Sequence, residues 1–228
     1  MLSHITEVKF ALIYQLVLYG SMVAGILFRK SIFPSSRYIF YLILITSVVE
    51  TIGLFSLKLY DKPASVIYDF FQPIELILIG LYFLGKYQEQ VNKVLSKVLV
   101  GIGILFLIAY HIIREFYELK AYYDFLIVAF IVSILSILFL IEVLRYHLDK
   151  ELLKYEVFWI STGILVFHAG SFVLMGTVVY VYLLNPKLAS QLYSINHLLN
   201  IIYYSLITYA FYIQWKSTKS SSSSLEGH

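Results

Sequence analysis

The sequence has no cysteine and few charged residues. Asp, Glu, Lys and Arg make up 14% of its 228 residues, against about 25% in soluble proteins, and 60% are apolar. The absence of cysteine excludes disulfides, thiolate metal ligands and a cysteine nucleophile. A chain with so little charge cannot cover a surface that faces water, so the composition predicts an integral membrane protein in contact with lipid.

Long uninterrupted apolar runs favour helices over a transmembrane barrel. Their lengths of about 17 to 25 residues suit membrane-spanning helices, and they lack the period-two alternation of barrel strands. We predict an all-α bundle, a single domain over residues 1–219, with seven transmembrane helices at 10–28, 38–57, 66–84, 98–113, 122–143, 157–183 and 192–215. Residues 220–228, which read SSSSSLEGH, are predicted to be a linker and the start of an expression tag.

Positive charge in the connections predicts the orientation. Of the 17 Lys and Arg residues, 6 fall on the side of the first residue, and 11 fall in the first, third and fifth connections and the tail. Positive residues concentrate on the cytoplasmic side of short loops. We therefore expect a multi-pass protein of the cytoplasmic membrane, with the N-terminus outside and the C-terminus inside. The net charge of +3 reflects this bias and indicates no nucleic-acid partner.

An internal repeat is predicted from residue spacing. Segments 38–57 and 66–84 align with 157–183 and 192–215 so that four positions correspond: Phe40 with Phe158, Glu50 with His168, Tyr68 with Tyr193, and Glu75 with Asn200. A parallel repeat of three helices, one linker helix and three helices explains this, although chance alignment of aromatic, apolar helices is the alternative. The arrangement is similar to that of small vitamin and sugar transporters, and loosely to opsins. No lysine lies in 192–215, which excludes a retinal Schiff base there.

Polar side chains within the apolar segments predict a site. Such groups are costly in lipid, so they face the bundle interior and pair, or line a functional cavity. At a rise of about 1.5 Å per residue, most of them fall in the middle and outer half of the membrane, above an apolar floor. Glu142 is the exception and is expected to snorkel. The predicted lining of an outward-facing cavity is Glu50, Tyr68, Asp69, Gln72, Glu75, His168, Tyr193, Asn196, His197, Asn200 and Tyr204.

Three functions are compatible with such a site. The first is binding, sensing or transport of a small molecule or ion, where sensing needs a signalling partner because the loops contain no output domain. The second is a zinc-dependent hydrolase of lipid-like substrates, with Glu50, Glu75, His168 and His197 as metal ligands. The third is a structural or partner-binding subunit, also as a homo-oligomer, in which Glu50 pairs with His168 and Glu75 with Asn200. No phosphate loop, dinucleotide fingerprint or nucleophile elbow is present, which disfavours an enzyme.

Overall fold

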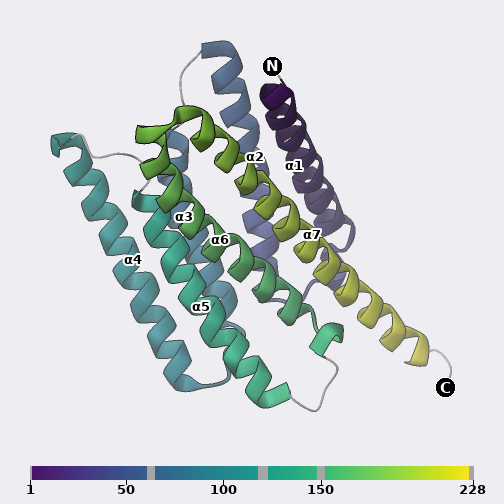
Figure 1. Cartoon of the computed structure of the whole chain (residues 1–228). Helices are drawn as coiled ribbons and strands as arrows, with labels where there is room; N and C mark the ends of the chain where they lie inside the picture. The colour runs from purple at the N-terminus through teal and green to yellow at the C-terminus, as the bar shows by residue number, and fades with distance from the viewer. Residues whose placement is uncertain (1, 61–64, 118–122, 148–151, 226–228) are drawn as a thin grey trace.

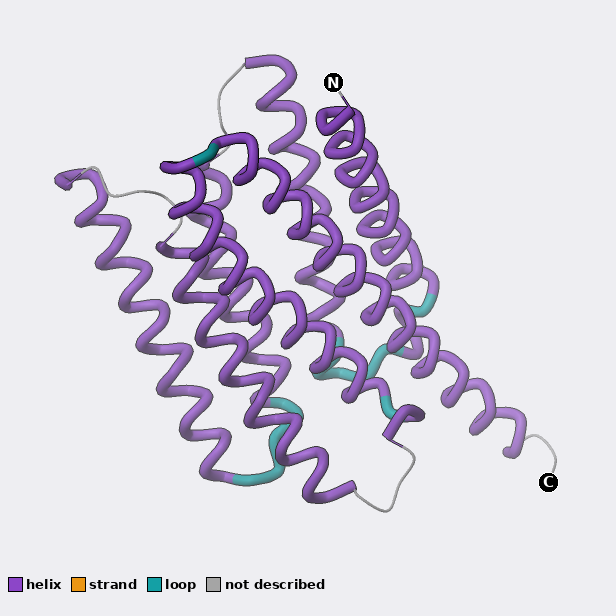
Figure 2. Tube along the Cα trace, in the orientation of Figure 1, coloured by secondary structure: helices purple, strands orange, loops and turns teal. Residues whose placement is uncertain are grey.

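The computed structural model describes residues 2–60, 65–117, 123–147 and 152–225, and within these ranges it contains helices and no strand. The α-helices are α1 (Leu2–Leu27), α2 (Arg37–Tyr60), α3 (Ser65–Leu84), α4 (Gln90–Tyr117), α5 (Tyr123–His147), α6 (Glu156–Leu184) and α7 (Pro186–Leu225). Short loops join α1 to α2, α3 to α4 and α6 to α7 (Figure 2). Two 3₁₀ helices, η1 (Arg29–Ser31) and η2 (Leu152–Lys154), lie between α1 and α2 and between α5 and α6, respectively.

The predicted all-helical fold is confirmed, and the helix ends differ from the apolar segments. Helix α1 begins at Leu2, α4 begins at Gln90, and α7 continues to Leu225 where the sequence suggests a linker. The reason is that apolarity marks only the part of a helix suited to lipid, whereas backbone hydrogen bonds extend the helix beyond it. Residue 122 and residues 226–228 lie outside the described residues.

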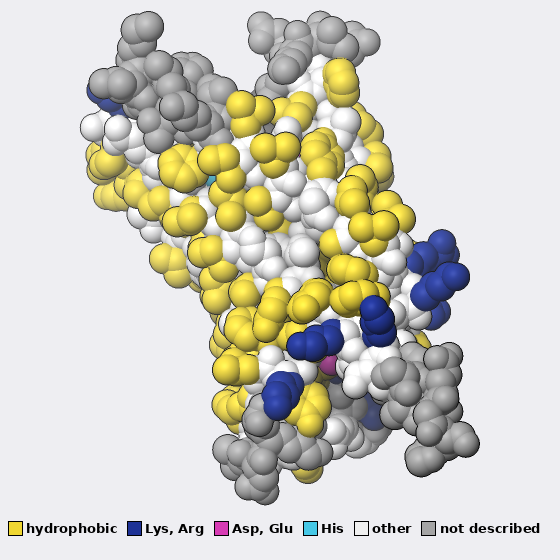
Figure 3. Space-filling model, turned by 90° about the vertical axis from the view of Figure 1, so that its right-hand side faces the viewer, with side chains coloured by type: hydrophobic (Ala, Val, Ile, Leu, Met, Phe, Trp, Pro, Cys, Tyr) yellow, Lys and Arg dark blue, Asp and Glu magenta, His cyan; other side chains and the backbone are white. Residues whose placement is uncertain are grey.

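Six helices, α1 to α6, contain stretches long and apolar enough to cross a membrane, as in a multi-pass membrane protein. Helix α7 is more polar, because Asn196, His197 and Asn200 interrupt its apolar sequence. Large apolar side chains such as Leu16 and Leu105 are about 70% exposed, at 71% and 69%. Figure 3 shows hydrophobic side chains over most of one face, with Lys and Arg side chains gathered in its lower part. Such a surface suits lipid.

The helices form a ring with one helix outside it. In the order α1, α2, α3, α5, α6 and α7, each helix packs against the next, and α7 packs against α1 to complete the ring. Helix α4 packs on α3 and α5 and lies at the edge of the bundle (Figure 1). The two chain ends lie at opposite ends of the bundle. The interior is filled by buried side chains that include Leu18, Ile43, Ile79, Leu135 and Phe211.

Helices α1 and α7 approach closely because small residues face the contact. The hydroxyl of Ser21 donates to the backbone carbonyl of Tyr204 at 2.9 Å and lies 2.6 Å from the Thr208 hydroxyl. One turn further, a Cβ at Gly25 would lie 3.3 Å from the ring of Phe211 on α7 and 2.5 Å from that of Phe40 on α2, so glycine leaves room for both rings. Small residues are the usual means by which helices approach each other in membranes.

The prediction that Glu142 snorkels is wrong. Its side chain is buried and accepts hydrogen bonds from the backbone N–H of Gln88, from that of Glu89 at 3.1 Å, and from Asn92 Nδ2 at 2.5 Å. These groups lie at the start of α4, where the first backbone N–H groups of a helix have no partner within the helix. Glu142 on α5 therefore caps α4.

Candidate functional site

A cavity of about 360 Å³ lies within the ring, in the half of the bundle where α1 begins. This volume is at the lower end of the range for small-molecule pockets. The structure places every predicted site residue except His168 around this cavity: Glu50, Tyr68, Asp69, Gln72, Glu75, Tyr193, Asn196, His197, Asn200 and Tyr204. The site residues predicted from the sequence, apart from His168, therefore share one cavity.

The lining residues of α7 and α3 reach the cavity because each set occupies one face of its helix. On α7, Tyr193, Asn196, Asn200 and Tyr204 follow one another at intervals of three or four residues, with His197 next to Asn196, and Tyr68, Gln72 and Glu75 repeat this spacing on α3. Pro73 lies inside α3 without ending it. Because proline has no N–H, the carbonyl of Asp69 lacks its usual helical partner beside the cavity.

Glu50 accepts a hydrogen bond from a tyrosine. Tyr68 donates it to Glu50 Oε1 at 3.2 Å. Tyr14 of α1 lines the same cavity as Glu50. The expected partner of Glu50, His168, is not the contact observed, because the packing of the helices brings His168 to α3.

His168 lies next to Glu75 instead. Its Nε2 is 3.8 Å from Glu75 Oε1, and its side chain is fully buried. Neither ring nitrogen of His168 makes a hydrogen bond within the described chain. The expected pair of Glu75 with Asn200 is not the contact observed, because Asn200 Nδ2 donates to the backbone carbonyl of Asn196 at 2.9 Å.

Aromatic rings form one wall of the cavity. Tyr14 stacks on the ring of His197 with centroids 5.7 Å apart, and Tyr193 meets the same ring edge-on at 5.7 Å. Tyr204 lies next to Tyr14, with centroids 6.1 Å apart. The imidazole of His197 is thus held between two tyrosines, and the wall presents both ring faces and hydroxyl groups.

The acidic side chains of the cavity differ in their partners. Asp69 receives two hydrogen bonds from the Arg114 guanidinium, at 2.8 and 2.5 Å, in a forked pair that joins α3 to α4. Glu50 and Glu75 differ, since among the described residues neither has a Lys or Arg within ion-pair distance. Glu50 instead contacts the Tyr68 hydroxyl, and Glu75 lies beside the His168 imidazole.

Sequence reasoning missed several lining residues. They are Tyr14, Thr46, Phe71, Asp124, Phe125, Phe167 and Met175. Among them, Asp124 is buried at the start of α5. Tyr14 carries no sequence signal of its own, because only the packing of α1 against α7 brings it to the cavity.

The four candidate zinc ligands do not gather into a metal site. Within the described parts of the chain, no group of three or more His, Asp or Glu side chains lies close enough together to hold a metal ion. Glu50, Glu75, His168 and His197 are all described, and the contacts above place Glu75 beside His168 but Glu50 among tyrosines.

Comparison with known proteins does not identify a family for this chain. It matches no protein-family model, no curated protein and no solved structure. The functional conclusion therefore depends on the geometry and chemistry of the cavity.

Proposed function

We propose that the protein spans the membrane with seven helices and binds a small organic cation in a cavity open to the outside, to sense or carry it. One observation is central to this proposal. Two carboxyl side chains, Glu50 and Glu75, line the cavity and, within the described parts of the chain, have no Lys or Arg at ion-pair distance. Buried carboxylates need a compensating positive charge or a proton. A bound cation supplies that charge.

The aromatic wall supports a cationic ligand. Faces of tyrosine rings attract ammonium groups, and desolvated sites strengthen this attraction to about 2 kcal/mol. Tyr14, Tyr68, Tyr193 and Tyr204 all line the cavity beside Glu50. Asn196 and Asn200 add amide groups that orient polar parts of a ligand. An amine or quaternary ammonium compound combines the charge and size that this lining favours.

Charge distribution supports the orientation. Lys and Arg side chains gather toward the end of the bundle where α7 ends, and the chain ends lie at opposite ends of the bundle (Figures 1 and 3). An odd number of spans places the two ends on opposite sides of a membrane, so α7 serves as the seventh span. With the positive end in the cytoplasm, the cavity opens outward.

The order in which the helices pack supports the predicted repeat. A repeat of this kind in turn favours transport. Helices α2 and α3 pack together as α6 and α7 do, and α3 packs on α5 as α7 packs on α1. Two units, α1–α3 and α5–α7, related by a two-fold axis with α4 as the linker, produce this order. Substrate sites of repeat-built transporters lie at the interface of the repeats, which is the position of this cavity.

Thermal unfolding in detergent with a matched set of compounds tests the proposal. A primary amine and a quaternary ammonium compound are expected to raise the melting temperature, whereas a neutral alcohol and a carboxylate of the same size are not. Glu50→Gln and Glu75→Gln keep the side-chain volume and should each abolish most of the shift. Glu89→Gln, outside the cavity, is the control. Equal stabilisation by the alcohol, or an unchanged shift in both cavity variants, would contradict the proposal.

Uptake into liposomes separates the two roles. A radiolabelled amine that stabilises the protein should accumulate in liposomes that contain a carrier and should only bind to a sensor. Uptake that persists in Glu75→Gln would show that the cavity is not the transport site.

A further inference from the structure

The floor of the cavity is not wholly apolar. Helices α3 and α6 run in opposite directions, and polar side chains from the two helices face each other at three successive levels below the cavity. The first level is Glu75 with His168, the second is Tyr82 with Ser161, and the third is Lys86 with Glu156. These levels extend from the cavity toward the end of the bundle where α7 ends.

The middle level consists of buried hydroxyl groups. Tyr82 and Ser161 are fully buried, and the Tyr82 hydroxyl faces that of Ser161, with geometry outside an ordinary hydrogen bond. Tyr203 of α7 is also buried, and its hydroxyl has no hydrogen-bond partner in the described chain. Its ring meets the His168 ring edge-on, with centroids 6.4 Å apart, and it lies near Tyr82. Tyr203 therefore neighbours both the first and the second level.

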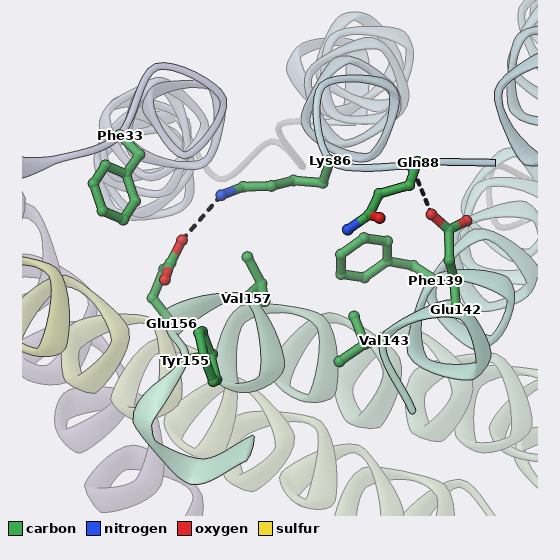
Figure 4. Close-up of a pocket in the computed structure, with 9 residues that line it drawn as sticks. All are labelled: Phe33, Lys86, Gln88, Phe139, Glu142, Val143, Tyr155, Glu156 and Val157. Carbon is green, nitrogen blue, oxygen red and sulfur yellow. Dashed lines mark hydrogen bonds and ion pairs between the residues drawn. The ribbon is translucent and has the colours of Figure 1, made fainter. Parts of the chain in front are cut away.

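The third level is an ion pair beside a second cavity. Lys86 Nζ lies 2.9 Å from Glu156 Oε1, and both side chains are largely buried. Figure 4 shows Lys86 extending from the end of α3 to Glu156, with the Phe33 ring beside them. The cavity there has a volume of about 290 Å³. Tyr82 lies within electrostatic range of Glu156, so the second and third levels are neighbours.

The spacing suits stepwise transfer. Tyr82 follows Glu75 by seven residues on α3, which corresponds to about 10 Å along the helix axis. Lys86 follows in the turn just after the end of α3. A buried water bonds to two to four polar groups, and the hydroxyl and imidazole groups here can supply such bonds.

Unpartnered buried polar groups need an explanation. Most buried polar side-chain atoms in proteins have a hydrogen-bond partner, because leaving one without a partner is unfavourable. Within the described chain, His168, Tyr203, Tyr82 and Ser161 each have a buried side-chain atom without such a partner, and they belong to the first and second levels. If they served stability alone, each would be expected to bond directly to a neighbour.

We propose that these groups form a proton path between the outer cavity and the second cavity. A proton taken up at Glu75 or His168 passes by way of the Tyr203, Tyr82 and Ser161 hydroxyls to the Glu156 carboxylate. Each hydroxyl accepts one proton and donates one, so it is unchanged after a transfer, and intervening water completes the longer steps. The path is independent of which molecule the cavity binds.

Proton flux into liposomes tests the path with protons alone. The purified protein is reconstituted with a pH-sensitive dye inside, and a potassium gradient with valinomycin makes the interior negative. We expect faster acidification than in protein-free liposomes. Tyr82→Phe and Tyr203→Phe remove a hydroxyl and keep the ring, and each should reduce the protein-dependent flux severalfold. Tyr209→Phe is the matched control, because this tyrosine is on α7 with its side chain 45% exposed.

Two results would overturn the proposal. One is a wild-type flux equal to that of protein-free liposomes, and the other is wild-type flux in both Tyr82→Phe and Tyr203→Phe. Melting temperatures of the variants show whether they fold, and loss of a hydroxyl that has no direct hydrogen bond to the described chain should change them little. A flux at the wild-type level with a lower melting temperature would assign the hydroxyls a structural role. Cation binding is measured separately, so loss of this proposal leaves that of the cavity ligand intact.

Discussion

Glu75 of α3 and His168 of α6 meet across the interior of the bundle, with 3.8 Å between Glu75 Oε1 and His168 Nε2. Each is the nearest ionisable partner that the structure shows for the other, and both are shielded from solvent. Glu75 lines the cavity, and His168 lies beside it, above the hydroxyl groups of Tyr82 and Ser161. The pair therefore connects the cavity to the proposed proton path.

A double-mutant cycle on this pair should show coupling. Glu75→Gln, His168→Gln and the double variant are compared by their free energies of unfolding in detergent. Residues in contact usually interact by about 0.5 to 3 kcal/mol, whereas distant pairs add within about 0.3 to 0.5 kcal/mol. Glu75 with Gln214, at the far end of α7, is the control pair. Additivity for Glu75 and His168 would show that their approach has no energetic consequence.

Arg114→Gln should destabilise the contact between α3 and α4. It leaves the buried Asp69 carboxylate without its forked partner, and we expect a loss of about 1 to 3 kcal/mol in unfolding free energy. The matched control is Arg145→Gln, because Arg145 forms its ion pair with Glu89 while 64% exposed. Exposed pairs contribute at most about 1 kcal/mol. Equal effects of the two substitutions would contradict the importance of burial at Asp69.

Gly25→Ala should destabilise the protein, whereas Gly20→Ala should not. A Cβ at Gly25 would lie 2.5 Å from the buried ring of Phe40, but at Gly20 no atom lies within 4 Å. Overpacking of this kind usually costs about 1 to 3 kcal/mol. At Gly20 the better helix propensity of alanine adds up to about 1 kcal/mol. Melting temperatures in one detergent provide the comparison, and a stable Gly25→Ala variant would show that α1 can move away from α2.

Labelling of single cysteines tests the orientation on a chain that has no cysteine of its own. Lys30→Cys and Lys187→Cys replace exposed lysines at opposite ends of the bundle. With the proposed orientation, a membrane-impermeant maleimide labels Lys187→Cys in intact cells and labels Lys30→Cys only after the membrane is opened. The reverse pattern would place the cavity on the cytoplasmic side.

The lining of the cavity was predictable because lipid restricts where polar side chains can point. Glu50, Glu75 and Asn200 interrupt apolar helices, so each had to face the interior, and each lines the cavity. Their partners were not predictable in the same way. Which interior faces meet depends on the order of the helices around the ring, and this order brings His168 to Glu75 and Tyr68 to Glu50.

The line of hydroxyl groups below the cavity was missed for a different reason. Tyrosine is abundant in this sequence, with 21 residues, and many tyrosines are expected at the two membrane interfaces. Serine is common where helices pack closely. Tyr82, Tyr203 and Ser161 are distinguished only by complete burial without a hydrogen-bond partner, which is a property of the packed structure.

Helix α4 lies outside the ring and packs only on its outer side, against α3 and α5. Its presence nevertheless determines the direction in which α5, α6 and α7 run. A chain that lacked α4 would cross the membrane one time fewer before α5, so α5, α6 and α7 would each enter from the opposite side. His197 and Asn200 would then approach the ends of α2 and α3 that are remote from Glu50 and Glu75. A helix at the edge of the bundle thus determines whether the chain crosses the membrane an odd or an even number of times before α5. The facing of the polar residues of α7 toward those of α2 and α3 depends on that number.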